Sequence, residues 1–547
     1  MSAYARITFF PSRVTGAVPR GTSLLHAARL LGVGMEGPCG GSGKCAKDLV
    51  QIRTGKTLDT VLACKTIVET DLEVIVPSHE KRELKVVGSF YQDSEKKAEL
   101  DPAVWKKAVL KDGQGPSTNV YINGKLMAEE HGDTTGALYG VAVDIGTTTI
   151  AASLVDIKTG RSLGDSSILN PLVHYGHDVM SRIRFSALHE DGLGTMHREL
   201  RSAVNLLIGV VCLENEVDRR SVYQVVAAGN TTMQHIFLNK GIKSIGEFPY
   251  NAEVLDEYTA SATELGVDVA PFGLVTTLPC ISAYVGGDIV SGLVAVADGE
   301  TALPAIFLDI GTNGELALLL EDRIIATSTA AGPCFEGMTI SSGMRAAEGA
   351  VEHVRLAPEL VLEVIGGGAP RGICGSGLLD LVSELLRTGL VNSRGRLQGA
   401  ESAGVPQEYK KYLFEKEGKR HFRVHDEVSI SQEDIRQVQL AKAAFRAGIE
   451  ILLKEYGIAA ADLKKVIIGG GFGYHLDEES IIRTGMLPGG LNTRISFVGN
   501  SSLEGAVRTL LDRKLIGRAR GITGSSHAID LSQIPAFESA YVREMRF

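Results

Sequence analysis

Three cysteines near the start of the 547-residue chain have a spacing suited to metal chemistry. A glycine-rich run separates Cys39 from Cys45, and Cys64 follows in the segment Leu-Ala-Cys-Lys-Thr. Iron–sulfur clusters are bound by thiolates on tight loops, where glycine lets backbone amides approach the sulfides. These cysteines therefore predict an iron–sulfur site.

The fourth ligand of such a site cannot be a nearby thiol, because the next cysteine is Cys212. The spacing resembles that of plant-type and adrenodoxin-type ferredoxins, in which a third cysteine falls three residues after the second. Here that position is Asp48, and a carboxylate is a harder ligand that favours oxidised iron. Two alternatives stay open: zinc bound by the same side chains, or a degenerate ferredoxin fold without a cluster. We expect a 2Fe–2S cluster, at a lower potential than an all-cysteine one, with the ligands Cys39, Cys45, Asp48 and Cys64.

Two turns further along the chain have the composition of phosphate-binding loops. Asp-Ile-Gly-Thr-Thr-Thr (144–149) and Asp-Ile-Gly-Thr-Asn-Gly-Glu (309–315) each follow an apolar, strand-like run. Backbone amides and threonine hydroxyls in such a turn can donate to phosphate oxygens, and the aspartate can hold Mg²⁺ through water. One copy is also typical of a hairpin, but two copies indicate two related α/β lobes. The candidate residues are Asp144, Gly146, Thr147, Thr148, Asp309, Gly311, Thr312 and Asn313.

Other glycine-rich segments occur in a matching order around these turns, at 229–233, 467–473 and 499–506. This order resembles the actin, sugar-kinase and heat-shock-chaperone superfamily, in which two ribonuclease-H-like lobes clamp ATP. The resemblance implies that Asp144 and Asp309 are catalytic residues near the phosphates and the metal. Asp309 is the stronger candidate, since the first copy could be a structural remnant. The glycines assigned to the nucleotide site are Gly332, Gly470, Gly471 and Gly473.

Longer segments at 328–337, 343–350, 372–380 and 485–490 match a narrower pattern. With the cysteine-containing N-terminal region, they resemble the reductive activators of corrinoid proteins. The resemblance implies an ATP-dependent electron transferase that returns cobalt from Co(II) to Co(I) to support methyl transfer. It implies two partners, a corrinoid protein of a methyltransferase system and an upstream reductase or ferredoxin. A small-molecule kinase and a nucleotide-gated partner-binding protein with a degenerate ferredoxin domain are the alternatives.

The expected fold is multidomain α/β. The expected layout is a 2Fe–2S β-grasp ferredoxin-like α+β domain (1–82), a linker (83–135), a middle ribonuclease-H-like domain (136–300) and a C-terminal actin-like ATPase domain (301–547). Strand-like alternation is expected at 4–10, 48–52 and 71–77, and a helix at 21–32, capped by Ser23 or Thr22.

Two further expectations concern single features of the chain. A long helix is predicted at 431–456, because Ser-Gln-Glu-Asp forms a capping box before apolar residues at helical spacing. The only tryptophan, Trp105, is expected to anchor the linker to a neighbour. Glu315 and Glu336, single acids beside glycine turns, are expected to be solvated or capping.

Composition excludes several classes of protein. The net charge is −9 without a basic block, which argues against nucleic acid and anionic membranes as partners. No apolar run is long enough to span a bilayer, and the first residues do not form a signal peptide, so a cytoplasmic location is expected. Four cysteines lie among apolar or small residues and are expected to be buried thiols rather than disulfides, namely Cys212, Cys280, Cys334 and Cys374.

Overall fold

The structure is a computed structural model that forms two compact units. The residues it describes are 4–10, 14–31, 33, 49–54, 57–75, 100–111, 115–296, 301–470, 476–491 and 494–547. One unit comprises Met1–Glu83 with Leu172–His177, and the other comprises the remaining residues.

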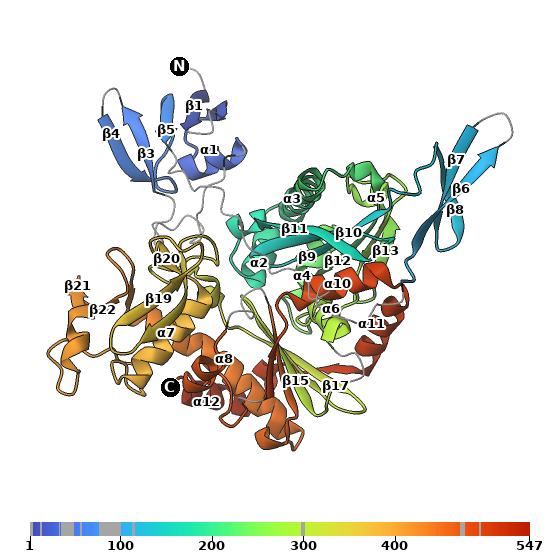
Figure 1. Ribbon diagram of the computed structural model, residues 1–547. Coiled ribbons are helices and arrows are strands. Elements are labelled where there is room, and N and C mark those ends of the chain that lie inside the picture. The colour runs from blue at the N-terminus through green and yellow to red at the C-terminus, as the bar shows by residue number, and fades with distance from the viewer. Residues whose placement is uncertain are drawn as a thin grey trace. The chain divides into compact units, whose positions relative to one another are not determined.

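The first unit is built on a five-stranded mixed sheet, shown in blue in Figure 1. The two strands at its centre, β1 and β5, run parallel, and the other neighbours are antiparallel. The strand order is β2 (Val14–Pro19), β1 (Tyr4–Phe10), β5 (Leu72–Ile75), β3 (Leu49–Thr54) and β4 (Thr57–Leu62).

Sequence alternation explains the local structure of this unit. Ile7 and Phe9 in β1 are fully buried, while their sequence neighbours are exposed or half-buried. Helix α1 (Leu24–Leu30) packs on the same core and begins after Ser23, whose Oγ accepts a hydrogen bond from the amide of His26 at 3.3 Å. The predicted strands and the predicted helix are thus present.

The second unit opens with a three-stranded antiparallel sheet of β6 (Val104–Lys111), β7 (Gly115–Ile122) and β8 (Lys125–His131). These residues lie in the segment expected to be a linker, yet they fold and contribute Val104 and Val120 to a buried core. Trp105 stacks on Tyr121 of the adjacent strand, with ring centroids 4.0 Å apart. Trp105 is expected to anchor the linker to a neighbour, and the stacking partner that the structure gives it lies in its own sheet.

Two six-stranded sheets form the body of the second unit. The first has the order β11 (Arg161–Leu169), β10 (Thr149–Asp156), β9 (Tyr139–Ile145), β12 (Val222–Gly229), β14 (Leu274–Thr277) and β13 (Tyr258–Ser261). The second has the order β25 (Ile495–Phe497), β24 (Lys465–Gly469), β15 (Ala305–Ile310), β16 (Gly314–Leu319), β17 (Ile324–Thr329) and β26 (Ser526–Ala528).

These two sheets share one topology. In each, three consecutive antiparallel strands are followed by strands that add in parallel beside the first of the three. β9 and β15 hold equivalent positions, and each ends at one of the Asp-Ile-Gly-Thr turns. The internal repeat predicted from these turns is therefore a duplication of a whole lobe.

Helices surround the two sheets. Those that follow strands of the first sheet are α2 (Val179–Leu188), α3 (Gly192–Glu214), α4 (Thr231–Phe237), α5 (Ala262–Leu265) and α6 (Gly287–Val296). Those in the second half of the chain are α7 (Gly375–Arg387), α8 (Gln432–Glu455), α9 (Glu478–Arg483), α10 (Ser501–Leu511), α11 (Lys514–Ser525) and α12 (Pro535–Glu544). None of the described helices combines the length and apolar character that crossing a membrane would need.

Helices α6 and α10 cross in close contact. A Cβ placed on Gly505 would lie 1.9 Å from the carbonyl oxygen of Ser291, so only glycine fits at the crossing. The Ser291 hydroxyl donates to the carbonyl of Ser502 at 2.6 Å. α10 also packs against β9 and β12, so a helix from the second half of the chain covers the first sheet (Figure 1).

The second lobe carries a large insertion between β17 and α8. It contains two small sheets, β18 (Ala350–Leu356) with β19 (Leu360–Val364) and β20 (Gly372–Ile373), and β21 (Leu413–Lys416) with β22 (Lys419–Arg423) and β23 (Ser429–Ser431).

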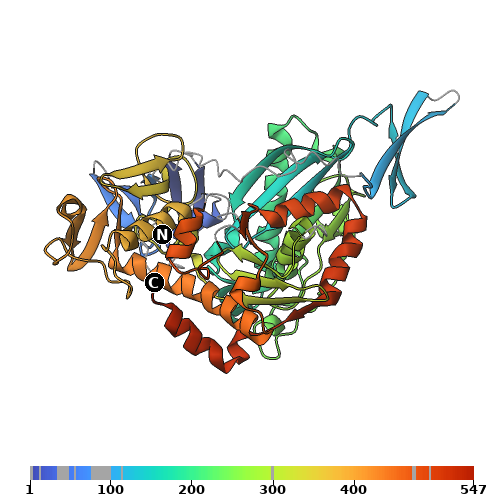
Figure 2. The ribbon, with the colours of Figure 1, turned by 60° about the horizontal axis from the view of Figure 1, so that its bottom comes forward.

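The long helix α8 follows this insertion and was correctly predicted. Ser431 and Asp434 form the expected capping box. The apolar side chains at helical spacing, such as Ile435 and Phe445, are fully buried. α12 packs along α8, in red and orange in Figure 2.

Candidate functional site

A cavity of about 240 Å³ lies in the second unit and brings the two Asp-Ile-Gly-Thr turns together. The predicted site residues that line it are Asp144, Gly146, Thr147, Thr148, Asp309, Gly311, Thr312, Asn313 and Gly470. Gly332 is not among the lining residues, but its amide donates to the carbonyl of Thr312 at 3.0 Å, so it bonds directly to the second turn. Gly471 and Gly473 lie outside the described residues.

The first turn is bound to the second half of the chain through Asp144, at the end of β9. Asn500 Nδ2 donates to one carboxylate oxygen at 2.9 Å, and the hydroxyl of Ser502 donates to the other at 2.8 Å. Burial raises the pKa of Asp144, and these two hydrogen bonds act in the opposite direction. Asp144 therefore links the lobes, because both of its oxygens are used by residues at the start of α10.

Thr147, the first of the three threonines in the first turn, is held by hydrogen bonds from Asn230 and Arg182. Asn230 caps α4 and also donates from Nδ2 to the Thr147 hydroxyl at 2.9 Å. The carbonyl of Thr147 accepts from the guanidinium of Arg182, a fully buried side chain. Burial lowers the pKa of Arg182 to about 9, which still leaves it charged at neutral pH.

The second turn presents Asp309 to the cavity. Its carboxylate accepts no hydrogen bond from the described part of the chain, in contrast to Asp144. Burial raises the pKa of Asp309 to about 8, and neighbouring carboxylates act in the same direction. Gly470 has φ +100° and lies so near that a Cβ there would be 2.7 Å from Asp309 Oδ1.

Two more acids face the cavity, Asp288, which is half-buried, and Glu315, which is buried, and Asp288 was missed from the sequence. Asp288 lies in the first turn of α6; burial, with the charge of Asp144, raises its pKa to about 7. Its signal was an acid directly after Gly286 and Gly287, at the start of an apolar helical run. Glu315 is 6% exposed, which corrects the expectation that it is solvated, and burial raises its pKa well above the usual value.

A chain of hydrogen bonds crosses the cavity between the lobes. The hydroxyl oxygens of Thr148 and Thr312 are 2.9 Å apart, and the Thr312 hydroxyl donates to Glu336 Oε1 at 2.8 Å. Because a hydroxyl has one proton, Thr148 is the donor to Thr312. Glu336 lines the cavity and is only partly exposed, so its expected role as a solvated or capping acid is also wrong.

The cavity suits a nucleotide bound with a divalent cation. Burial raises the pKa of Asp288, Asp309 and Glu315, and neighbouring carboxylates act in the same direction, so a bound cation would favour their ionised forms. No three His, Cys, Asp or Glu side chains in the described ranges converge on one metal position. Gly311 has room above its Cα, which lets phosphate oxygens approach the backbone.

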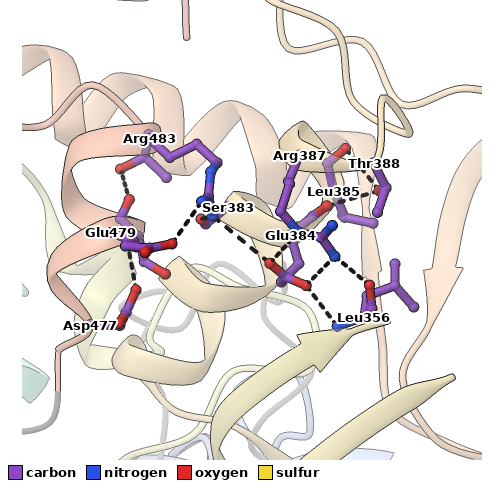
Figure 3. Close-up of polar contacts among 11 residues, drawn as sticks. Leu356, Ser383, Glu384, Leu385, Arg387, Thr388, Asp477, Glu479 and Arg483 are labelled. Carbon is purple, nitrogen blue, oxygen red and sulfur yellow. Dashed lines mark hydrogen bonds and ion pairs between the residues drawn. The ribbon is translucent and has the colours of Figure 1, made fainter. Parts of the chain in front are cut away.

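The far wall of the cavity is the N-terminal end of α7, with Gly375 and Ser376 among the lining residues. Figure 3 shows how α7 is held. Arg483 of α9 donates to the hydroxyl of Ser383 at 2.9 Å, and the amide of Leu356 donates to Glu384 at 2.7 Å. α7 is thereby fixed to both α9 and β18.

The predicted iron–sulfur ligands are only partly within the described residues. Cys39, Cys45 and Asp48 lie outside them. Cys64 is half-buried and packs against the core of the first unit. The other cysteines are buried and reduced as predicted, and burial raises the pKa of each, namely Cys212, Cys280, Cys334 and Cys374.

Two lobes of equal topology that enclose an acid- and threonine-lined cavity define an actin-like ATPase fold. Residues 304–547 match a family model described as the C-terminal domain of RACo, the ASKHA domain, and residues 139–297 match a model of the RACo middle region. The chain belongs to the family of reductive activators of corrinoid proteins.

Individual relatives agree with this assignment. The chain is 28% identical over 559 aligned positions to the corrinoid activation enzyme RamQ of Eubacterium limosum, with 93% of each chain covered. It is 25% identical to the [Co(II) methylated amine-specific corrinoid protein] reductase of Methanosarcina barkeri, with 75% of this chain and 77% of the relative covered. A solved structure of a reductive activator for a corrinoid, iron–sulfur protein aligns over 99% of this chain and 98% of its own, with 29% identity and a TM-score of 0.78.

Proposed function

We propose that this chain is an ATP-dependent reductive activator that returns the cobalt of a corrinoid protein from Co(II) to Co(I). The near end-to-end agreement with relatives named for this activity carries the proposal. The interlobe cavity supports it, because a reduction that is driven by ATP needs a nucleotide site whose walls come from two movable parts.

Bound at this cavity, ATP with Mg²⁺ would supply the free energy for an electron transfer that is otherwise uphill. For one electron, a deficit of about 240 mV corresponds to roughly 5.5 kcal/mol. Asp309 would face the metal through water, and Thr312 and the backbone of the second turn would donate to phosphate oxygens. Asp144 would couple nucleotide binding at the first turn to the position of α10 through its hydrogen bonds with Asn500 and Ser502.

We propose that the first unit is a β-grasp ferredoxin-like domain. A five-stranded mixed sheet with two central parallel strands and one packed helix supports this assignment. A 2Fe–2S cluster would supply one-electron chemistry there, accepting its electron from an upstream reductase or ferredoxin. Its ligands would be Cys39, Cys45, Asp48 and Cys64.

We propose a corrinoid protein of a methyltransferase system as the partner, since Co(I) is the nucleophile of methyl transfer. The linker at 83–135 and the boundary between the middle and C-terminal domains near residue 300 stay part of this proposal. Within that linker, β6, β7 and β8 form a small folded sheet.

The direct test is anaerobic reduction of a Co(II) corrinoid protein from the same cell. The purified chain, a low-potential reductant and Mg-ATP should produce the Co(I) absorption band, and omission of ATP should prevent it. Iron and sulfide analysis of the same preparation should give two of each per chain. Absence of the Co(I) band with every corrinoid protein of that cell would refute the activity.

A further inference from the structure

Among the acids that line the cavity, Asp309 accepts no hydrogen bond from the described residues and is assigned to the metal side of the site, and Glu336 has one carboxylate oxygen that is fully buried without a partner among those residues. Both oxygens of Asp144 accept from α10 residues, Asp288 accepts from the amide of Ile289 at 2.9 Å, and Glu315 accepts from the hydroxyl of Ser328 at 3.3 Å. Glu336 Oε1 accepts from Thr312, but Oε2 is buried and has no hydrogen-bond partner among the described residues. Burying a carboxylate oxygen without a hydrogen-bond donor costs free energy. Because this oxygen lies at the cavity, a donor that belongs to a bound ligand or to water would offset that cost.

The backbone holds this side chain in one place. Glu336 ends the short 3-10 helix Pro333–Glu336, which lies between Gly332 (φ +77°) and Gly337 (φ +72°). A Cβ on Gly337 would be 2.5 Å from the carbonyl oxygen of Met344, so the turn fits closely against its neighbour. The carboxylate is therefore preorganised before any ligand arrives.

Its position relative to the two turns indicates what that ligand is. Thr312 belongs to the second phosphate-binding turn and bonds both Glu336 and Thr148 of the first turn. Glu336 thus lies where the two turns meet. A nucleotide bound by both turns would bring its outermost phosphate to this meeting point, within reach of the free oxygen of Glu336.

We propose that Glu336 is the catalytic residue that orients the attacking water in ATP hydrolysis at this site. The inference rests on the proposed nucleotide site. The water oxygen forms a bond to the γ-phosphorus while the bond from that phosphorus to the β,γ-bridging oxygen breaks, and ADP leaves with the bridging oxygen. One water proton passes to Glu336 Oε2 and from there to the released phosphate, so the residue is unchanged after each turnover.

The decisive variant is Glu336→Gln. Its side-chain carbonyl still accepts from Thr312, but an amide group replaces the free oxygen and cannot accept a proton from water. In single turnover with protein in excess over ATP, we expect the hydrolysis rate to fall by about 100-fold or more. The dissociation constants for ATP and a non-hydrolysable analogue should stay within about threefold of wild type, since no binding contact is lost.

Three further variants separate this role from a structural one. Glu336→Asp keeps a carboxylate and should recover part of the lost rate, and Glu348→Gln, at an exposed position outside the cavity lining, should behave as wild type. Glu315→Gln tests the other buried acid as the water-binding group.

Three results would overturn the assignment to Glu336: hydrolysis by Glu336→Gln within about threefold of wild type, a loss of ATP affinity as large as the loss of rate, or hydrolysis abolished in Glu315→Gln alone. These assays need no corrinoid protein, so their results can still be interpreted if the chain fails to reduce cobalt. A wild-type chain that does not bind ATP would overturn this inference and the proposed function together.

Discussion

The hydroxyl oxygens of Thr148 and Thr312 lie 2.9 Å apart, although one belongs to the first lobe and the other to the second. Thr312 directly follows the glycine of the second Asp-Ile-Gly-Thr turn, whereas Thr148 lies one residue further along in the first turn, after Thr147. The two turns therefore meet through side chains, and the cavity between the lobes is closed by direct hydrogen bonds rather than by packing alone.

Replacing Thr148 by valine should weaken nucleotide binding without unfolding the lobe. The variant keeps the side-chain shape but loses a hydrogen bond worth about 1 kcal/mol, so we expect roughly a fivefold rise in the dissociation constant. Titration calorimetry measures it. Thr259→Val is the matched control, because Thr259 and Thr276 form a similar pair, 3.1 Å apart, outside the cavity. Equal effects in the two variants would contradict a role at the nucleotide site.

Ser502→Ala should lower the stability of the second unit. It removes one of two donors to the buried carboxylate of Asp144, and hydrogen bonds to charged groups contribute about 1.5–3 kcal/mol. The neighbouring Ser501 provides the control, because its hydroxyl is buried without a partner among the described residues and Ser501→Ala removes no hydrogen bond. Thermal unfolding should show a lower midpoint for Ser502→Ala only.

Nucleotide-free protein should lose stability as the pH rises towards 9. The folded-state pKa of Asp309 is raised to about 8 from an ordinary value of 3.8, so its contribution is fully present below pH 3.8 and is lost as the pH passes through 8. Asp309→Asn should remove much of this dependence between pH 6 and 9, as measured by unfolding midpoints. Binding of Mg-nucleotide should release protons near neutral pH, detectable as a buffer-dependent heat. Proton uptake on binding would show that the sign is wrong.

Gly470→Ala should disrupt the second turn. The glycine has φ +100°, and the new Cβ would lie 2.6 Å from the carbonyl oxygen of Ile310, so strain of about 1–3 kcal/mol or more is expected where Asp309 sits. ATP affinity should fall by more than tenfold. Gly489→Ala, in the same lobe with no atom within 4 Å of the added Cβ, should bind ATP normally.

Asp48→Cys should keep the proposed cluster and raise its reduction potential. Thiolate is a softer ligand than carboxylate and stabilises oxidised iron less. Anaerobic redox titration followed by visible spectroscopy measures the change. An unchanged spectrum and potential in both Asp48→Cys and Asp48→Ala would exclude Asp48 as a ligand.

The sequence predicted those parts of the fold and site that local patterns determine. The Asp-Ile-Gly-Thr repeats marked the ends of β9 and β15, and the capping box at Ser431 marked the start of α8. Contacts between residues distant in sequence were not predicted, because no local pattern indicates that Asn500 and Ser502 hydrogen-bond to Asp144.

Other misses have a different physical cause. Glu315 was read as solvated because acids usually are, yet its cross-strand position opposite Asp309 places it inside the cavity. β6 looked like linker because Lys106 and Lys107 interrupt its apolar pattern. Lys106 is in fact buried, with its ammonium group bonded to Glu130 at 2.8 Å and Tyr223 at 2.7 Å.

The crossing of α10 onto the first sheet has a consequence for cutting the protein into pieces. Ala506, Val507 and Leu510 on this helix are buried against residues such as Ala142 and Val226, which precede residue 300. A fragment that begins at residue 304 would expose the apolar face of α10 to solvent. A fragment that ends before residue 304 would expose the face of the first sheet that α10 covers. The core of the first sheet is therefore completed by a helix from the far end of the chain, and we expect neither half to fold stably when it is expressed alone.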